Sequence, residues 1–259
     1  MLIFSSRCLP ALVGAAGLIM PLVAAHGVAG AARTLAPETT TREFPLARGG
    51  RLTVQTGRGD ITIQAWTRPA IELKAVKTGD SESDLAAVPI DIRAAADEVN
   101  IASPAPAGAG VSHTRVDYQL RVPADVDLKL VRTGRGRVQI AGTNGRAVVQ
   151  VENGTVRITD FSGVLEAVTV NGEVDAAFAR VDPNESIRIE TFNGDIRLRL
   201  PKAVSPHFEV RTLNGRVQSE FPITVEKVFG PQVAHGAGTP DAPFVNLVSV
   251  TGDIHISRR

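Results

Sequence analysis

Cysteine and aromatic residues are nearly absent from this chain. Of its 259 residues only Cys8 is a cysteine, and aromatic side chains make up 4%. Because Cys8 precedes the apolar run near the N-terminus, the chain beyond that run has no cysteine and must be held by burial and backbone pairing alone. With so few aromatic side chains, we expect a core built from Val, Ile, Leu and Ala.

An excess of one charge is lacking too. The chain has 28 Lys and Arg against 27 Asp and Glu, which gives a formal net charge of +1. Binding to nucleic acid or to an anionic membrane surface needs a basic excess or a clustered basic face. We therefore expect no nucleic-acid partner.

Long hydrophobic segments are missing except near the N-terminus. There Arg7 precedes an uncharged apolar run from Leu9 to Ala25, and small residues follow the run. A positive residue, a short apolar run and small residues are the layout of a secretory signal peptide. An uncleaved anchor is the alternative, although the run is short for a membrane-spanning helix. We predict a signal peptide over residues 1–32, with cleavage after Ala25, Gly30 or Ala32, and a linker over residues 33–42.

No later segment approaches membrane-spanning length. The mature protein is therefore expected to be exported to the periplasm or the cell surface, with no stable membrane insertion after signal cleavage. The remainder, residues 43–259, is expected to form one domain.

Glycine, in contrast, is frequent, and seven glycines lie at the centre of a repeated pattern. Two copies read V-Q-T-G-R-G-D-I-T-I from Val54 and V-R-T-G-R-G-R-V-Q-I from Val131, and the other five have Asn or Thr before the glycine. A backbone conformation that only glycine adopts at low cost explains why this residue never changes between copies. The predicted structural turn glycines are Gly59, Gly136, Gly154, Gly172, Gly194, Gly215 and Gly252.

Apolar and polar residues alternate on both sides of each glycine. In the second copy Val131 and Val138 belong to one face, whereas Arg132 and Gln139 belong to the other. Alternation with a period of two is the signature of a half-buried strand. Asn-Gly between two such segments is a strong turn signal, because both residues accept a positive φ. Each copy is thus predicted to be a strand, a turn and a second strand.

The same comparison settles how to interpret Arg58-Gly59-Asp60, a tripeptide that a cell-surface receptor could recognise. The position of Arg58 holds Asn in four other copies, and the position of Asp60 changes sign freely between copies. The tripeptide therefore arises where two variable turn positions flank an obligatory glycine. We favour a structural turn over an adhesive motif.

The spacing of the copies predicts an all-β, β-solenoid-like fold. Four successive glycines, from Gly136 to Gly194, lie 18, 18 and 22 residues apart, so each repeat is one unit that stacks on its neighbours. Stacked strands would lie about 4.8 Å apart, with Val and Ile filling the interior. Threonines before the turn, such as Thr133, would hydrogen-bond the turn backbone.

The repeat block is expected over residues 131–259, and irregular strands over residues 66–130. Alternation in residues 71–77, 89–94, 98–102 and 114–123 predicts antiparallel strands, which would cover one end of the stack. Residues 80–88 could form a short helix or a charged loop. Residues 230–243 are expected to be an irregular connection.

This arrangement resembles the bacterial putative-adhesin family, a β-strand-repeat domain of unknown function. The resemblance rests on the glycine-turn repeats, on the segment from Arg48 to Trp66 and on Y-Q-L-R-V-P from Tyr118, and it covers the chain from about Glu43 onward. It implies a β-solenoid-like fold, but it brings no ligand and no catalytic residues.

Candidate catalytic chemistry is sparse. The histidines beyond the signal, among them His255, show no metal-ligand spacing, and there is no nucleophile elbow or phosphate loop. If the copies at Gly172 and Gly194 are neighbours, Glu173 and Asp195 would lie close together and could bind calcium or act as an acid–base pair. The alternative is a solvated ladder of turn residues. We expect no cofactor.

These observations together favour a non-enzymatic, adhesin-like or scaffold module of the bacterial envelope. Its partner would be an envelope or surface component, either a glycan or a protein. Two alternatives stay open: a β-helical glycan hydrolase or lyase, and a regulatory partner in envelope-stress signalling.

Overall fold

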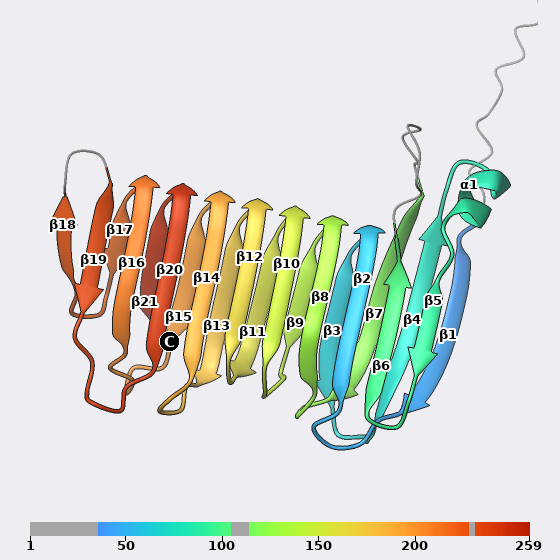
Figure 1. Ribbon diagram of the computed structural model, residues 1–259, viewed down its shortest axis with the longest axis horizontal. Coiled ribbons are helices and arrows are strands. Elements are labelled where there is room, and N and C mark those ends of the chain that lie inside the picture. Colours follow the sequence, from blue (N-terminus) through green and yellow to red (C-terminus); the bar gives the residue numbers. More distant parts are fainter. Residues whose placement is uncertain (1–35, 105–113, 228–230) are drawn as a thin grey trace, which may run out of the picture. The chain divides into compact units, whose positions relative to one another are not determined.

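The computed structural model describes residues 36–104, 114–227 and 231–259, and the predicted signal peptide and its cleavage sites lie outside them. All described residues belong to one unit, Thr34–Arg259. In this part of the chain nearly all regular structure is β-strand, and the strands form two sheets (Figure 1). The predicted all-β, β-solenoid-like fold is confirmed.

The first sheet, sheet A, has ten strands and is parallel except at one end. In spatial order its strands are β1 (Glu38–Pro45), β4 (Ala70–Thr78), β7 (Arg115–Pro123), β3 (Ile61–Trp66), β9 (Val138–Ala141), β11 (Val156–Ser162), β13 (Val174–Arg180), β15 (Ile196–Leu200), β21 (Ile254–Arg258) and β17 (Val217–Ser219).

The second sheet, sheet B, has eleven strands and is parallel except at its two edges. Its strands, in spatial order, are β18 (Thr224–Lys227), β19 (Gln232–Gly236), β16 (His207–Asn214), β20 (Phe244–Thr251), β14 (Ser186–Asn193), β12 (Leu165–Asn171), β10 (Ala147–Asn153), β8 (Asp127–Arg135), β2 (Arg51–Arg58), β6 (Glu98–Ser103) and β5 (Asp91–Ala94).

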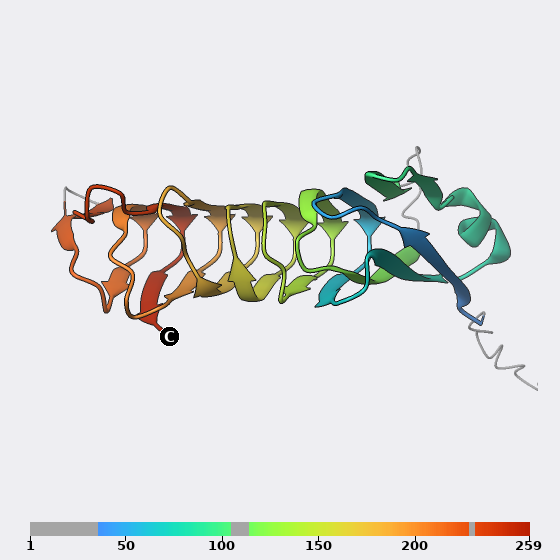
Figure 2. The same cartoon turned by 90° about the horizontal axis from the view of Figure 1, so that it is seen from below.

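Each copy of the repeat forms one rung, in which a strand of sheet B passes through the glycine turn into a strand of sheet A (Figure 2). The two strands of a rung therefore lie in different sheets and do not pair with each other. Equivalent residues stack instead on neighbouring rungs: Val149 pairs with Val131 and with Ala167. All three are fully buried between the sheets. Each such Val contributes about 1.5–3 kcal/mol relative to exposure.

The order of the rungs in space differs from their order in the chain. The first five follow the sequence, from β2–β3 to β14–β15. The last copy, β20–β21, then lies between β14–β15 and β16–β17, so Leu247 pairs with Ile189 on one side and with Val210 on the other. Stacking in sequence order is thus wrong for the last two copies. Because every copy presents the same alternating pattern, the repeat itself does not encode which rungs are neighbours.

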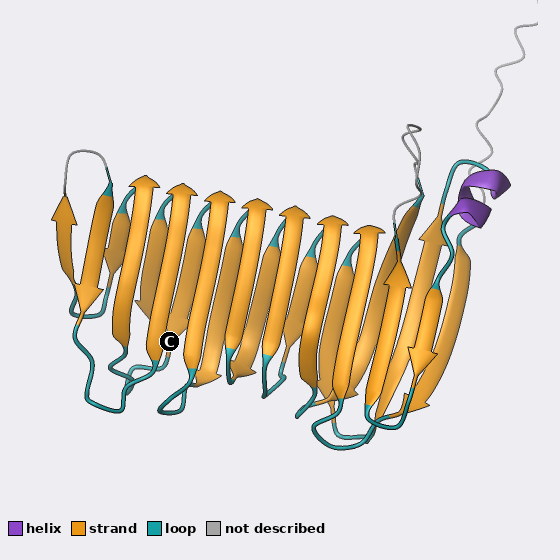
Figure 3. Cartoon of the chain, viewed as in Figure 1, coloured by secondary structure: helices purple, strands orange, loops and turns teal. Residues whose placement is uncertain are grey.

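The strands that precede the repeat block extend both sheets at one end, as expected. Strand β4 pairs antiparallel with β7, and β5 pairs antiparallel with β6. Helix α1 (Glu82–Ala87) lies in this region, so the helical alternative for residues 80–88 is the correct one (Figure 3). Ser81 caps the helix by accepting the N–H of Asp84. The side chain of Lys77 holds the other end by donating to the carbonyls of Leu85 and Val88.

Three sequence-based expectations need correction. Residues 38–42, expected to be a linker, belong to edge strand β1, whose mostly exposed side chains give no apolar alternation. The segment over residues 230–243 contains β19, in which only Ala234 is buried. Strand β8 begins at Asp127, before the repeat block expected from Val131, so the end of the 66–130 region already belongs to a rung. Folded structure therefore begins before residue 43, the expected start of the domain.

Candidate functional site

The turn glycines form a continuous column along one edge of the rungs. A Cβ on Gly136 would lie 2.0 Å from the carbonyl oxygen of Gly59, and one on Gly154 would lie 1.8 Å from that of Gly136. Real Cβ atoms do not approach an oxygen so closely, so a side chain at these positions would force the rungs apart. Close backbone approach, together with a positive φ at six of the seven glycines, explains why the pattern admits only glycine.

The residue before the glycine behaves differently from the expectation. Among the described residues other than glycine, only Asp160 and Asn184 have a positive φ, so the Asn of each Asn-Gly pair is not left-handed. The reason is topological: the turn joins two sheets, whereas the turn with two positive φ values closes a hairpin within one sheet. The Asn side chains stack across rungs instead. Asn171 donates to Asn153 and Asn193 donates to Asn171, each at 2.9 Å.

The residues that follow the glycines form a second line, here called the turn row. In spatial order the turn row is Asp60, Arg137, Thr155, Glu173, Asp195, Asp253 and Arg216. Its aspartates are part of the backbone pairing. The carboxylate of Asp60 accepts the N–H of Arg137 at 2.6 Å, and that of Asp195 accepts the N–H of Asp253 at 2.8 Å.

This geometry bears on the Arg-Gly-Asp tripeptide. The other oxygen of the Asp60 carboxylate lies 2.8 Å from the guanidinium of Arg115. A hydrogen bond to Asp117, helped by the charge of Asp60, raises the pKa of Arg115 above its ordinary value. A receptor would have to displace these contacts before it could use the carboxylate. The environment of Asp60 supports a structural turn.

Glu173 and Asp195, the candidate metal or acid–base pair, do lie on neighbouring rungs, since Val174 pairs with Ile196. Arg197 lies against both carboxylates: it donates to Glu173, and its guanidinium is 3.8 Å from Asp195. A cation would have to compete with that guanidinium. Within residues 36–104, 114–227 and 231–259, no group of three or more His, Cys, Asp or Glu side chains is placed to hold a metal ion.

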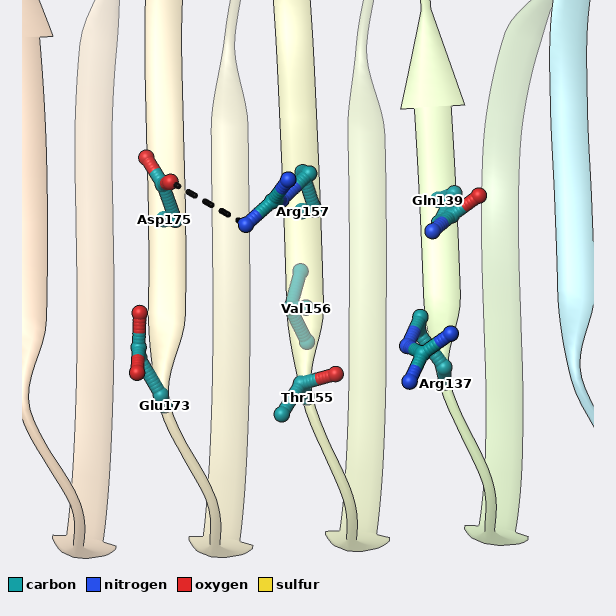
Figure 4. Close-up of a pocket in the computed structure, with 7 residues that line it drawn as sticks. All are labelled: Arg137, Gln139, Thr155, Val156, Arg157, Glu173 and Asp175. Carbon is teal, nitrogen blue, oxygen red and sulfur yellow. Dashed lines mark ion pairs between the residues drawn. The ribbon is translucent and has the colours of Figure 1, made fainter.

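A polar depression of about 340 Å³ lies beside this pair on the outward face of sheet A, the face turned away from sheet B (Figure 4). It exists because Thr155 is the one short residue between the longer turn-row side chains of Arg137 and Glu173. Its lining spans β9, β11 and β13 and consists of Arg137, Gln139, Thr155, Val156, Arg157, Glu173 and Asp175. The one apolar residue, Val156, is buried in the core, so the exposed lining is polar and can offer hydrogen bonds in several directions.

An unexpected apolar surface lies on the outward face of sheet B. Val170 is 46% exposed, Phe192 is 56% exposed and Leu213 is 48% exposed, and each stands just before the Asn of its rung. Val250 occupies the same place on β20, between the strands of Phe192 and Leu213. These four residues, here called the apolar row, therefore cross four adjacent strands. The alternation shows that they point outward, but only the order of the rungs reveals that they are contiguous.

The residues at the same position on the next three rungs are no longer apolar side chains. Glu152 follows Val170, and Gly134 and Gly57 come after it. At the two glycines the surface is hollowed into a depression of about 360 Å³. The apolar side chains thus form a ridge beside a hollow. The presence of Glu152 also shows that a charge is compatible with the fold at this position of a rung.

Two histidines lie outside these surfaces. His255 points outward from β21, as expected, and its ring nitrogen lies 3.3 Å from the side-chain oxygen of Gln218. His207 accepts a hydrogen bond from the N–H of Gly238. No helix among the described residues is long and apolar enough to cross a bilayer.

Comparison with known proteins identifies the architecture. The family model of Toastrack DUF4097 matches residues 37–257. The chain belongs to this toastrack family. The family is one of unknown function, and no curated protein matches the sequence.

Solved structures of bacterial proteins resemble the toastrack chain along most of its length. A "putative cell adhesion protein" from Clostridium sporogenes shares 12% identity over 86% of this chain and 100% of its own, with a TM-score of 0.48. A "putative adhesin" from Bacteroides fragilis shares 11% identity over 86% of this chain and 97% of its own, with a TM-score of 0.37. At such identities these similarities carry no information about a ligand.

Proposed function

We propose that this toastrack protein is a non-enzymatic, exported module of the bacterial envelope that binds a partner through the outward face of sheet B. The observation that carries the proposal is the apolar row. Its residues point away from the core, so the fold does not require them to be apolar. Contiguous exposed apolar surface is unfavourable in water and marks sites of interaction.

The surroundings of the apolar row support a contact surface. On one side lies the ladder of asparagines, whose amides stay accessible at the edge of the rungs. On the other side are charged pairs such as Arg188 and Glu190, 2.6 Å apart. An apolar strip between polar borders has the anatomy of a protein–protein contact, with a dry centre and a wet rim. We therefore favour an envelope protein over a glycan as the partner.

Export belongs to the same proposal. It is supported by the layout of residues 1–32, a positive residue followed by a short apolar run and small residues. A glycan-cleaving function finds less support, because Arg197 lies against the candidate carboxylates Glu173 and Asp195. An acid–base pair must be free to contact the substrate, whereas Glu173 already accepts a hydrogen bond from Arg197.

A matched pair of variants tests the binding surface. Val170 lies in the apolar row and is 46% exposed, whereas Val225 on edge strand β18 is 44% exposed and lies outside the row. The mature protein and its Val170→Glu, Phe192→Glu and Val225→Glu variants would be incubated with isolated envelope fractions and cross-linked. We expect one component to be captured by the parent protein and by Val225→Glu, but not by the two row variants.

Three other results would contradict the proposal. Capture that persists in both row variants would place the contact elsewhere. Loss of a dimer in the row variants, seen by sedimentation, would show that the row binds a second copy rather than a partner. Cleavage of any member of a glycan panel by the purified protein would overturn the non-enzymatic assignment.

A further inference from the structure

On the outward face of sheet A, two equivalent ion pairs join the rung of β13 to the rung of β15. Glu173 on one rung accepts a hydrogen bond from Arg197 on the next, and Asp175 accepts one from Arg199 at 2.5 Å. Both contacts are diagonal, because Asp175 is level with Arg197 in the register of β13 and β15. Carboxylates on β13 are in this way matched by guanidinium groups on β15.

The arrangement is reversed two rungs earlier, at the depression in Figure 4. The same diagonal between β9 and β11 joins Arg137 to Arg157, because Arg157 is level with Gln139. Arg137 makes no ion pair with any residue in the described ranges. The carboxylate that pairs with Arg157 is that of Asp175, 3.9 Å away, and Arg199 contacts the same carboxylate more closely. Cations therefore occupy both ends of the diagonal that joins opposite charges between β13 and β15, and the guanidinium of Arg157 is directed toward Asp175 (Figure 4).

The groups around these two guanidiniums are also donors. Gln139 can donate from its amide and Thr155 from its hydroxyl, and both line the depression. Guanidinium groups bind carboxylate and other oxyanions through paired hydrogen bonds. An anion in the depression would give Arg137 the oxyanion partner that it lacks and would give Arg157 a closer one than Asp175, while leaving the contacts of Glu173 and Asp175 with β15 intact.

We propose that this depression binds the carboxylate of an acidic sugar within a polysaccharide. The sugar class follows from the rest of the lining. The exposed side chains of the lining offer donors and acceptors together, which suits hydroxyl groups, and Val156 is buried in the core beneath them. A volume of about 340 Å³ is at the small end of ligand pockets, enough for one sugar unit of a longer chain. The site lies on the opposite face from the apolar row and is independent of it.

The first experiment is an NMR or calorimetric titration with three probes. They are a galacturonic-acid tetrasaccharide, its fully methyl-esterified form, which differs only in the lost charges, and inorganic sulfate. We expect the acidic tetrasaccharide to bind at least about tenfold more tightly than the ester, since each charge-assisted hydrogen bond contributes that much. Arg137→Gln and Arg157→Gln should each weaken binding by about tenfold.

Arg216→Gln is the matched control. Arg216 is an exposed arginine of the turn row on another rung, so its loss changes the net charge equally but leaves the depression untouched. Equal weakening by all three substitutions would reduce the effect to general charge and overturn the proposal. Equal binding of the acid and its ester, or binding of sulfate alone, would overturn it too.

A second variant separates binding from folding. Thr155→Glu fills the depression and places a carboxylate beside Arg137 and Arg157, as Glu173 stands beside Arg197. We expect the acidic tetrasaccharide to stop binding while the Tm stays equal or rises. Retained binding by Thr155→Glu would place the ligand elsewhere and refute the site.

Discussion

A Cβ on Gly172 would lie 1.5 Å from the carbonyl oxygen of Gly154. The backbones of these two glycines touch, and the contact recurs along the whole glycine column. The spacing of the rungs at this edge is therefore set by main-chain atoms alone.

Replacing Gly172 by Ala should destabilise the protein strongly. The added Cβ forces one rung away from the next and strains a φ of +159° as well. We expect the free energy of unfolding, measured with urea, to fall by roughly 3 kcal/mol or more. Gly49→Ala is the control, because Gly49 has a φ of +66° but nothing within 4 Å of an added Cβ. Its cost should be about 1–2 kcal/mol, the strain of φ alone. Equal costs would show that backbone contact does not matter.

The hydroxyl of the threonine beside the turn can be removed on one rung and introduced on the next, and the effect on stability can be measured in each case. The buried hydroxyl of Thr133 donates to the carbonyl of Gly59 at 2.9 Å. Thr133→Val should cost about 1–2 kcal/mol, because it leaves that carbonyl without this donor. Val151 holds the same place one rung further, and Val151→Thr restores the hydroxyl opposite Gly136. Chemical denaturation should show Val151→Thr to be neutral or stabilising by up to about 1 kcal/mol. No loss in Thr133→Val together with a loss in Val151→Thr would mean that the hydroxyl contributes nothing.

Tyr118 predicts an alkaline limit to stability. It is the only tyrosine in the chain, it is 1% exposed, and burial raises the pKa of its hydroxyl to about 12. A raised pKa means that the folded state favours the neutral phenol. Stability is then complete below the unfolded value near 10 and falls as pH rises from there toward 12.

The measurement is direct because no other tyrosine absorbs. Ultraviolet titration of the folded protein should show no phenolate until well above pH 10, and urea denaturation should show Tyr118→Phe losing less stability than the parent between pH 10 and 12. The hydroxyl has no hydrogen-bond partner among the residues that the structure describes, so at pH 7 the variant should be at least as stable as the parent. Ionisation near pH 10 in the folded protein would disprove the burial argument.

Arg197 should control whether the two carboxylates near it bind a cation. In the parent protein its guanidinium lies against Glu173 and Asp195, and we expect calcium to leave the Tm unchanged. In Arg197→Gln the carboxylates face each other on adjacent rungs. The variant should lose less than about 1 kcal/mol, as is usual at exposed ion pairs, and calcium should recover it. Calorimetry that shows calcium stabilising the parent protein would revive the metal site.

Alternation and glycine were enough to predict the rungs, because both follow from local backbone geometry. Val131 and Val138 are buried and Arg132 is exposed, as their pattern requires. The prediction that the Asn before each glycine has a positive φ was wrong, because it assumed that the turn closes a hairpin. A ten-residue pattern does not show whether its two strands pair with each other or enter different sheets.

The candidate surfaces were harder to foresee, because they depend on which rungs are neighbours. Glu173 and Asp195 come from consecutive copies, and their proximity could be predicted. The role of Arg197 was not predicted, although this residue lies only two positions beyond Asp195. Its side chain extends diagonally to Glu173 on the neighbouring strand. The apolar row could not be predicted, since Val250 comes to lie between Phe192 and Leu213 only through the insertion of β20.

That insertion also constrains how the fold can assemble. Rungs from β8–β9 to β14–β15 can stack on one another in the order of the chain. The rung β16–β17 follows in the chain, but its parallel partners β20 and β21 are the last two strands. Only the antiparallel strands β19 and β18 can pair with it first, as a separate nucleus. Residues 244–259 must then enter between two preformed edges. Assembly of this protein therefore finishes by closing an internal gap, a step that depends on long-range contacts and should be its slowest.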